Sequence, residues 1–536
     1  MNRVFFIGID AGDFKYIEPL VKRNKLPNFR KLIQSGAWCV LESTNPPLTP
    51  VAWTTLLSGL GKSEHKVFSW TKFSDDLKEI TPINANDIKI PRVWDILNVY
   101  GIKSVVMNLP LTYPAYPING VMVSGFDAEA YDDRATAMTE PLKNEFKEKY
   151  PDYSIMVEYK NIYQGLEIFK KLWKEDCRKK TEAFIYLMNK TSAQFGILVY
   201  MIVDHLNHYI PYGLKKHRTQ VEWAYSIVDQ EIGRIMDEME KTDSIIICSD
   251  HGSVFIKQNF FINKWLADNG YLRFYDDKLP DKIYRNIYNK LSMKARIFKI
   301  FGEKFGEKLF RFLFEAIPTS LKKKVVKRVR DKSVLGFSFD CIDLENTKLF
   351  CKEAYGQVFI NERRLKREGE RFEILEEVLI KMQKDVKDGK IPPFRVLDKH
   401  VSRDEKDAPH LELELESEDI LFNVFNFMND SSYLEVNHQS YRGDHRKKGI
   451  FLALGRGIIP VKKTRKLKMT EITPLLTVLA SGKLPKYLEG NIPREILGKE
   501  IEFFIDEKGV NEFLPMNNYD FEEDMTKRKL ENLGYL

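Results

Sequence analysis

The sequence predicts an α/β fold in which a mostly parallel sheet lies between two layers of helices. Short apolar runs alternate with amphipathic runs of helical period over residues 1–260, and the alternation returns after residue 431. Polar residues stand at or just after the ends of several apolar runs, which is where open α/β sheets carry their ligand sites. Between about 260 and 430 the alternation stops, which predicts a lobe inserted into the core fold.

Six apolar runs are predicted to be buried strands, because each is short, rich in β-branched or other large apolar residues and bounded by polar or turn residues. They are residues 4–10, 102–108, 121–125, 195–203, 243–250 and 449–455. Amphipathic spacing predicts helices between them, as in 26–37 and 223–241.

The predicted domain organisation has four parts: a first part of the catalytic core (1–260), an inserted cap lobe (261–430), a second part of the core (431–500) and a C-terminal extension (501–536). Within the lobe, helical spacing appears at 260–272 and 371–386, and 347–365 has a strand-like pattern. The segment 128–192, with a helical pattern over 164–190, is a further candidate element of the cap.

Composition narrows the class of protein. Hydrophobic residues make up 43% of the chain and charged residues 30%, as in a globular protein. No apolar run is long enough to span a membrane, and VFFIGID lacks the cleavage site of a signal peptide. The five cysteines form no CxxC pair, so we expect neither a disulfide framework nor a cysteine zinc site. The expected location is the cytoplasm, with a peripheral membrane position as the alternative.

The basic residues are concentrated in segment 282–332. This segment has 16 Lys/Arg against 4 Asp/Glu, whereas the whole chain has a formal net charge of +7. Aromatic and aliphatic residues recur there at helical spacing, which suits either peripheral contact with an anionic membrane or packing on the core or a second subunit. Nucleic acid is a weaker alternative, because the apolar residues share one face. The sequence leaves the oligomeric state open.

Seven residues with the chemistry of metal ligands or nucleophiles are spread along the chain. They are Asp10, Thr49, Asp204, His208, Asp250, His251 and His445. Asp204 and His208 are four apart, so one helical turn places them on the same face. Pro50 suits the first turn of a helix, which puts Thr49 at the helix entrance, where the dipole favours phosphate. Three carboxylates, three imidazoles and one hydroxyl suit two divalent ions that share a nucleophile, and predict hydrolysis of a phosphate ester.

Each of these features has a structural alternative. Thr49 is also a plausible helix cap, and Asp250 with His251 and Gly252 also fits a tight turn. We expect Asp13 to cap the helix that begins at Phe14 rather than to bind metal. The remaining neighbours of the candidate ligands, His205, His438 and Asp444, are expected to orient the ligands or to lie away from them.

In order along the chain, several motifs resemble the alkaline phosphatase superfamily, most closely the prokaryotic members of its type I phosphodiesterase/nucleotide pyrophosphatase family. They are IGIDAGD, PPLTPVAWTTLLSG, NLPLTYPAYPINGVMVSGF, DHLNH, SDHG, GDHRKKGIF and EITPLLTVLASGKLP. The resemblance implies an alkaline-phosphatase-like sheet with an inserted cap lobe. It also implies one zinc ion on Asp10, Thr49, Asp250 and His251 and a second on Asp204, His208 and His445, with manganese or iron as alternatives.

We expect from this a two-metal phosphodiesterase or pyrophosphatase that acts through a phosphothreonine at Thr49, one ion lowering the pKa of Thr49 and the other stabilising the leaving oxygen. The alternatives are a phosphomonoesterase or phosphomutase on the same core, and a non-catalytic, metal-stabilised scaffold associated with a membrane. Retention of Thr49 argues against a scaffold. Two positions depart from the family pattern: Ala52 replaces an Asn that helps hold the phosphoryl group, and Lys66 replaces a Gly after His65. The absence of a Cys-x-Pro-x-Arg sequence argues against the sulfatases.

Overall fold

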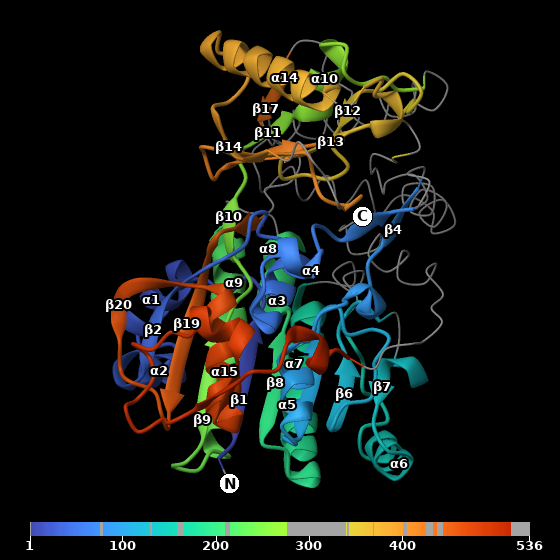
Figure 1. The fold of residues 1–536 in the computed structure, drawn as a ribbon. Coiled ribbons are helices and arrows are strands. Elements are labelled where there is room, and N and C mark those ends of the chain that lie inside the picture. The colour runs from blue at the N-terminus through green and yellow to red at the C-terminus, as the bar shows by residue number, and fades with distance from the viewer. Residues whose placement is uncertain are drawn as a thin grey trace, which may run out of the picture. The chain divides into compact units, whose positions relative to one another are not determined.

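The structure is a computed structural model that describes residues 2–74, 79–128, 131–157, 166–209, 215–275, 339, 342–367, 369–399, 405–424, 432–436 and 443–515. The described parts form two compact units (Figure 1). The first unit is drawn from Met1–Lys72, Thr81–Phe255 and Arg442–Leu533, and it contains all seven candidate site residues. The second is drawn from Phe73–Ile80, Ile256–Tyr441 and Gly534–Leu536.

A nine-stranded sheet forms the centre of the first unit. Its order is β20 (Lys462–Lys468), β2 (Ala37–Glu42), β19 (Lys448–Gly455), β9 (Ser244–Cys248), β1 (Val4–Ile9), β8 (Phe195–Tyr200), β5 (Ser104–Leu109), β6 (Gly120–Ser124) and β7 (Thr136–Ala137). The strands are parallel except for β19 and β7, which run antiparallel to their neighbours. The predicted α/β class and all six predicted strands are confirmed.

Helices cover both faces of this sheet (Figure 1). One group comprises α1 (Phe14–Lys22), α2 (Pro27–Ser35), α7 (Leu166–Thr191) and α9 (Lys215–Asp237), and the other α3 (Thr49–Ser58), α5 (Val93–Val99) and α15 (Ile472–Ser481). Successive strand side chains point to opposite faces. Accordingly, Phe5 of β1 contacts Phe184 of α7, whereas Phe6 contacts Trp53 of α3. Coverage of both faces explains why every residue of β1 is buried.

Shorter elements complete the first unit. They are α4 (Lys62–His65), α6 (Glu140–Lys149), α8 (Ile202–Tyr209), β10 (Gly252–Phe255), β18 (Gly443–Arg446), β21 (Lys483–Pro485), β22 (Phe504–Asp506) and the 3-10 turns at Ala85–Asp87, Asp133–Ala135, Met469–Glu471, Lys486–Asn491 and Val510–Phe513. β3 (Thr71–Phe73) and β4 (Ile80–Pro82) form a small two-stranded sheet.

The described residues of the second unit form two small sheets, two helices and a 3-10 turn at Glu362–Arg364. One sheet has the order β12 (Leu349–Phe350), β13 (Gln357–Ile360), β15 (Leu411–Leu415) and β14 (Phe394–Lys399); the other has β16 (Ile420–Asn423), β11 (Gln258–Phe261) and β17 (Leu434–Val436). The helices are α10 (Ile262–Asp268) and α14 (Glu370–Lys387). The predicted helix at 260–272 is partly wrong, because Phe260 and Phe261 pair with β16 and β17 as part of β11.

Two sequence-based predictions concern other stretches of the chain. The basic segment 282–332, with its predicted membrane contact, lies outside the described residues. Residues 128–192, the further candidate element of the cap, fall within Thr81–Phe255, which belongs to the first unit. In the described part of the chain, every helix is too short or too polar to cross a bilayer.

One edge of the large sheet collects the strand ends that carry the candidate site. β9, β1 and β8 are adjacent and parallel, with Gly8 opposite both Cys248 and Val199, so their carboxyl ends lie together. β19 runs antiparallel to β9, with Phe451 opposite Cys248, so the residues that precede β19 reach the same edge. His445 precedes its strand, whereas the other candidate ligands follow theirs, and the reversed direction of β19 accounts for this difference.

Candidate active site

Asp10 and Asp250 place two buried carboxylates at this edge, after β1 and β9. Asp10 Oδ2 accepts a hydrogen bond from Trp53 Nε1 at 3.3 Å, and Asp250 Oδ1 accepts one from the Ala11 amide at 3.4 Å. Among the described residues, none donates a hydrogen bond to Asp10 Oδ1 or Asp250 Oδ2. These two oxygens lie 3.6 Å and 3.2 Å from His251 Nε2, respectively. Buried carboxylate oxygens without donors are costly unless a cation compensates them.

The tautomer of His251 follows from its backbone contact. Its Nδ1 lies 3.0 Å from the carbonyl oxygen of Gly252, which can only accept, so Nδ1 carries the hydrogen. Nε2 of the neutral ring therefore presents a lone pair to Asp10, Asp250 and Thr49. Metal-binding histidines commonly have their second ring nitrogen held in this way.

Thr49 is the first residue of α3 and is fully buried. Leu48 precedes the helix in an extended conformation, and Pro50 occupies the first turn, where its missing N–H costs nothing. Thr49 Oγ1 lies 3.3 Å from His251 Nε2. The hydroxyl therefore lies at the positive end of the α3 dipole and next to the two buried carboxylates.

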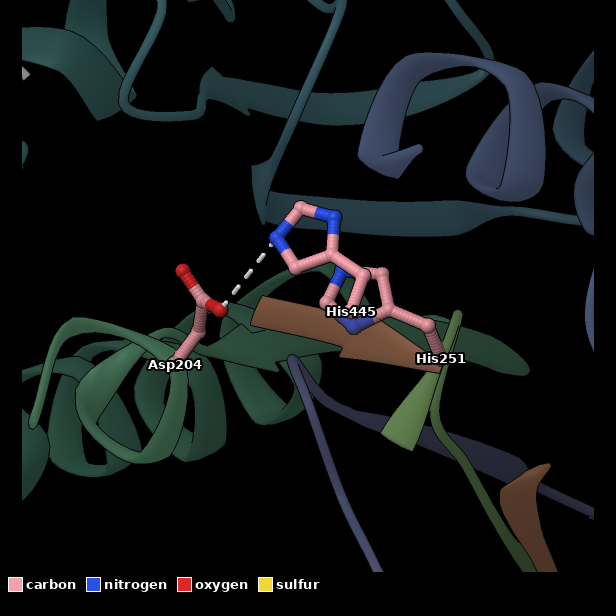
Figure 2. A group of neighbouring side chains, drawn as sticks. All are labelled: Asp204, His251 and His445. Atoms are coloured by element: carbon pink, nitrogen blue, oxygen red, sulfur yellow. Dashed lines mark ion pairs between the residues drawn. The ribbon is translucent and has the colours of Figure 1, made fainter. Parts of the chain in front are cut away.

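A second group of donors comes from α8 and β18. Nε2 of His208 lies 3.1 Å from Asp204 Oδ1 and 3.0 Å from His445 Nε2, and the distance from His445 Nε2 to Asp204 Oδ1 is 3.8 Å. The His445 ring also hydrogen-bonds the carbonyl of Pro47, which leaves Nε2 facing Asp204. Figure 2 shows the ring of His445 lying against that of His251; their centroids are 3.8 Å apart and their planes differ by 19°.

Burial and neighbouring charged groups shift the pKa of all three carboxyl groups, Asp10, Asp250 and Asp204. Burial raises the pKa of Asp10, and the charges of Asp250 and Asp204 raise it further. Burial and the charge of Asp204 likewise raise the pKa of Asp250. For Asp204, burial acts upward, but His208 and the other imidazoles outweigh it and lower the pKa. Ionising all three buried carboxyl groups together is therefore unfavourable unless a cation compensates their charge.

The donor atoms fit divalent metal ions. Two groups have ligand atoms within 4.8 Å of one another, Asp10 with Asp250 and His251, and Asp204 with His251 and His445. Tetrahedral ligands at metal distances of about 2.0–2.1 Å are separated from each other by about 3.3 Å. The donor atoms around His251 and around Asp204 are 3.0–3.8 Å apart. Carboxylates and imidazole Nε2 atoms are also the donor types that zinc prefers.

Other residues singled out in the sequence have structural contacts. Asp13 caps α1, as predicted, by accepting a hydrogen bond from the Lys15 amide. Asp444 Oδ1 accepts a hydrogen bond from the His445 amide at 2.7 Å. His205 is buried, with its ring 5.1 Å from that of Trp173. His438 lies outside the described residues.

Trp53 is a site residue that the sequence reasoning missed. It follows Thr49 by four positions on α3, so both side chains reach the cluster from one helix face. Gly8 makes room for it, because a Cβ there would lie 2.6 Å from Trp53 Cη2. The spacing from Thr49 was the available sequence signal, but a tryptophan at helical spacing is more often a core residue.

His65 stabilises the loop after the Thr49 helix in its neutral form. Its Nδ1 accepts a hydrogen bond from the Val67 amide at 3.0 Å, so Nε2 donates to Thr55 Oγ1, which is 2.9 Å away. Burial lowers the pKa of His65 to about 3, and the charge of Lys62 acts in the same direction. Lys66 follows with φ 61°, the left-handed conformation that favours glycine, which accounts for the Gly of the family pattern.

The lowered pKa of His65 predicts a loss of stability in acid. The unfolded chain takes up a proton near pH 6.5 that the folded chain resists until about pH 3, so the free energy of unfolding should decrease as the pH falls through this window. His65→Asn keeps an acceptor for Val67 and removes the titration. Between pH 6 and 4, the free energy of unfolding of this variant, measured with urea, should change less with pH than that of the wild type. The difference in slope should reach up to about 1.4 kcal/mol per pH unit. Parallel curves for the two proteins would contradict the prediction.

Comparisons with known proteins concern the family and the fold of the chain. The family model for type I phosphodiesterase / nucleotide pyrophosphatase matches residues 4–333. Phosphonoacetate hydrolase from Sinorhizobium meliloti 1021, in complex with phosphonoformate, has a TM-score of 0.50 at 10% identity over 89% of this chain and 96% of that one. Human ectonucleotide pyrophosphatase/phosphodiesterase 5 gives 0.48 at 12% identity over 89% and 95%. The murine protein gives 0.47 at 12% over 93% and 100%. A search of curated proteins found no match.

The structural likeness concerns the fold, since the identities are near one tenth. The family match carries the assignment, because it spans more than half of the chain and includes Asp10, Thr49 and the Asp250–His251 pair. The chain therefore belongs to the type I phosphodiesterase/nucleotide pyrophosphatase family, in the alkaline phosphatase superfamily, and is a phosphoric ester hydrolase.

Proposed function

We propose that the protein is a two-metal phosphohydrolase that cleaves phosphodiester or pyrophosphate bonds with Thr49 as the nucleophile. The observation that carries this proposal is the position of the Thr49 hydroxyl. It is buried at the amino end of α3, and its oxygen lies 3.3 Å from His251 Nε2, beside the carboxylates of Asp10 and Asp250. The N-cap of α3 is Leu48 rather than Thr49, so helix capping does not account for this position of Thr49.

The donor separations support two ions held by separate groups. Asp10, Thr49, Asp250 and His251 would hold one, and Asp204, His208 and His445 would hold the other. The mixture of carboxylates and imidazoles favours zinc, with manganese or iron as alternatives. Bound divalent ions supply Lewis-acid chemistry: they lower the pKa of an alcohol or water oxygen and neutralise charge on phosphate oxygens.

The residues of the chain orient the substrate and carry the covalent step. Thr49 Oγ loses its proton and attacks phosphorus, and the bond from phosphorus to the leaving oxygen breaks as that oxygen takes a proton. Water then attacks the phosphothreonine, which releases phosphate or a phosphate monoester and restores the hydroxyl. The amino end of α3 stabilises negative charge on the phosphoryl group. Ala52 is buried and offers no side-chain hydrogen bond to that group.

The arrangement favours diesters over monoesters. A monoester dianion profits from an additional cation, and the sequence offers Lys62 and Lys66 near the Thr49 loop. Lys62 Nζ donates to the carbonyl of Asn45 at 2.8 Å, and Lys66 is exposed. We therefore expect kcat/KM for an aryl phosphodiester to exceed that for the matching aryl monoester by at least about tenfold, or about 1.4 kcal/mol in transition-state stabilisation.

Steady-state kinetics of the metal-loaded enzyme with the two aryl esters tests this preference. A Thr49→Ala preparation purified in the same way controls for contaminating phosphatases. The reverse preference would favour a phosphomonoesterase or phosphomutase on the same core.

A further inference from the structure

Asp13 is a buried carboxylate that ties together three separate parts of the chain. Its Oδ1 caps α1 by accepting from the Lys15 amide at 2.9 Å, and its Oδ2 accepts from the Ser253 amide at 3.2 Å. The guanidinium of Arg446 donates to both oxygens, from Nη2 to Oδ1 at 2.7 Å and from Nε to Oδ2 at 2.9 Å. Two parallel bonds of this kind fix the relative orientation of the planar groups.

Each of these contacts lies next to a candidate metal ligand. Asp13 itself is three residues after Asp10, Ser253 is two residues after His251, and Arg446 directly follows His445. Ser253 and His445 are also register partners in the antiparallel pair of β10 and β18. One carboxylate therefore holds the backbone beside ligands of both donor groups.

The backbone at Gly252 is shaped for this approach. A Cβ at Gly252 would lie 2.9 Å from Asp13 Oδ2 and 2.3 Å from the carbonyl oxygen of Lys448. A side chain there would push β10 away from Asp13. The same glycine supplies the carbonyl that fixes the tautomer of His251, so both contacts depend on this close packing.

We propose that Asp13 and Arg446 are positioning residues for the metal site, which lock the antiparallel pair of β10 and β18 so that His251 and His445 present Nε2 to the ions. This inference rests on the proposed function, since it assumes that the two histidines bind metal. Asp13 and Arg446 touch neither substrate nor metal in this proposal, and they act through the strand that carries the ligands. Partners beyond the ligands typically change metal affinity by roughly 10–100-fold.

The chain contains a matched control pair. Arg3 and Asp243 form a second aspartate–arginine pair in the same unit, with Arg3 Nη2 2.8 Å from Asp243 Oδ2 and Nε donating to the same oxygen at 2.9 Å. In both pairs the arginine side chain is 18% exposed and the aspartate side chain is 0% exposed. Asp243 precedes β9, at the sheet edge opposite the site. The two pairs should therefore contribute similarly to stability, and only one should affect metal.

The experiment measures zinc affinity of the full-length protein by competition with a chromophoric chelator, together with unfolding of the metal-free form. Asn still caps a helix, so Asp13→Asn should fold. We expect Asp13→Asn and Arg446→Gln each to lower zinc affinity about 10–100-fold, and the double variant to lower it little further. Asp243→Asn should destabilise the metal-free protein to a similar degree with zinc affinity within about twofold of the wild type.

Equal zinc affinity in Asp13→Asn, Asp243→Asn and the wild type would overturn the positioning role while leaving the two-metal proposal intact. Equal losses in Asp13→Asn and Asp243→Asn would also overturn it, because both would then reflect general destabilisation. Failure of the wild type to bind zinc, manganese or iron would overturn both proposals. Partial recovery of affinity in Arg446→Lys, which keeps the charge but loses the paired geometry, would support the role.

Discussion

Thr49→Ala is expected to lower turnover by at least about 10³-fold while both ions remain bound, because the variant loses its nucleophile. A neutral hydroxyl contributes little to affinity beside Asp10, Asp250 and His251, whose donor atoms surround the same point. Thr49→Ser should retain measurable activity, since it keeps the oxygen.

Thr54→Ala is the matched control for this variant. Thr54 is a buried threonine of the same helix, 4% exposed, and stands outside the donor cluster in the proposed mechanism. Its loss should change stability more than kcat. In the wild type, acid quenching during turnover followed by mass spectrometry should find phosphate on the peptide that contains Thr49. If Thr49→Ala kept more than a few per cent of the activity, water would have to be the first nucleophile.

Loss of a single ligand is expected to remove one ion and most of the activity together. Asp250→Ala takes away an oxygen 3.2 Å from His251 Nε2, and His208→Ala takes away a nitrogen 3.1 Å from Asp204 Oδ1. The ions would belong to different groups, so each variant should keep one of the two. The activity loss should exceed the roughly 10–100-fold that is typical of partners beyond the ligands.

Elemental analysis of gently purified protein measures this outcome, with two ions per wild-type chain as the reference. Asp229→Ala is a suitable control, because Asp229 is also a buried aspartate, but its carboxylate accepts hydrogen bonds from the amides of Asn28 and Phe29 at the start of α2. It should lose stability and keep both ions. A wild-type protein with full activity and fewer than two ions would rule out the two-metal mechanism.

His251 is a candidate ligand of both metal ions. Its Nε2 belongs to both groups of candidate ligands, and its ring stacks on that of His445. The family pattern places His251 with Asp10 and Asp250, whose Oδ1 and Oδ2 atoms lie 3.6 Å and 3.2 Å from its Nε2, respectively. The Asp250→Ala and His208→Ala variants test this division directly. If both ions shared His251 as a ligand, each variant would lose both ions together.

The sequence by itself determined the strands of the core and the set of candidate site residues. Continuous apolar runs are buried strands in any α/β fold, so β1, β8 and β9 could be predicted with the polar residues that follow them. The spacing of Asp204 and His208 and the proline after Thr49 are local signals, because they depend only on residues that are close in the sequence. The motifs, taken in their order along the chain, indicated the family.

The tertiary structure decided which of these residues meet. β9, β1 and β8 are neighbours although they are far apart in the sequence, and no local pattern encodes that order. Strand direction is equally non-local: the antiparallel insertion of β19 brings His445 to the edge that the other candidate ligands reach from parallel strands. The contacts of Trp53 with Asp10 and of Asp13 with Arg446 join residues 43 and 433 positions apart. Such contacts depend on how whole elements pack, which is why they became visible only in the folded chain.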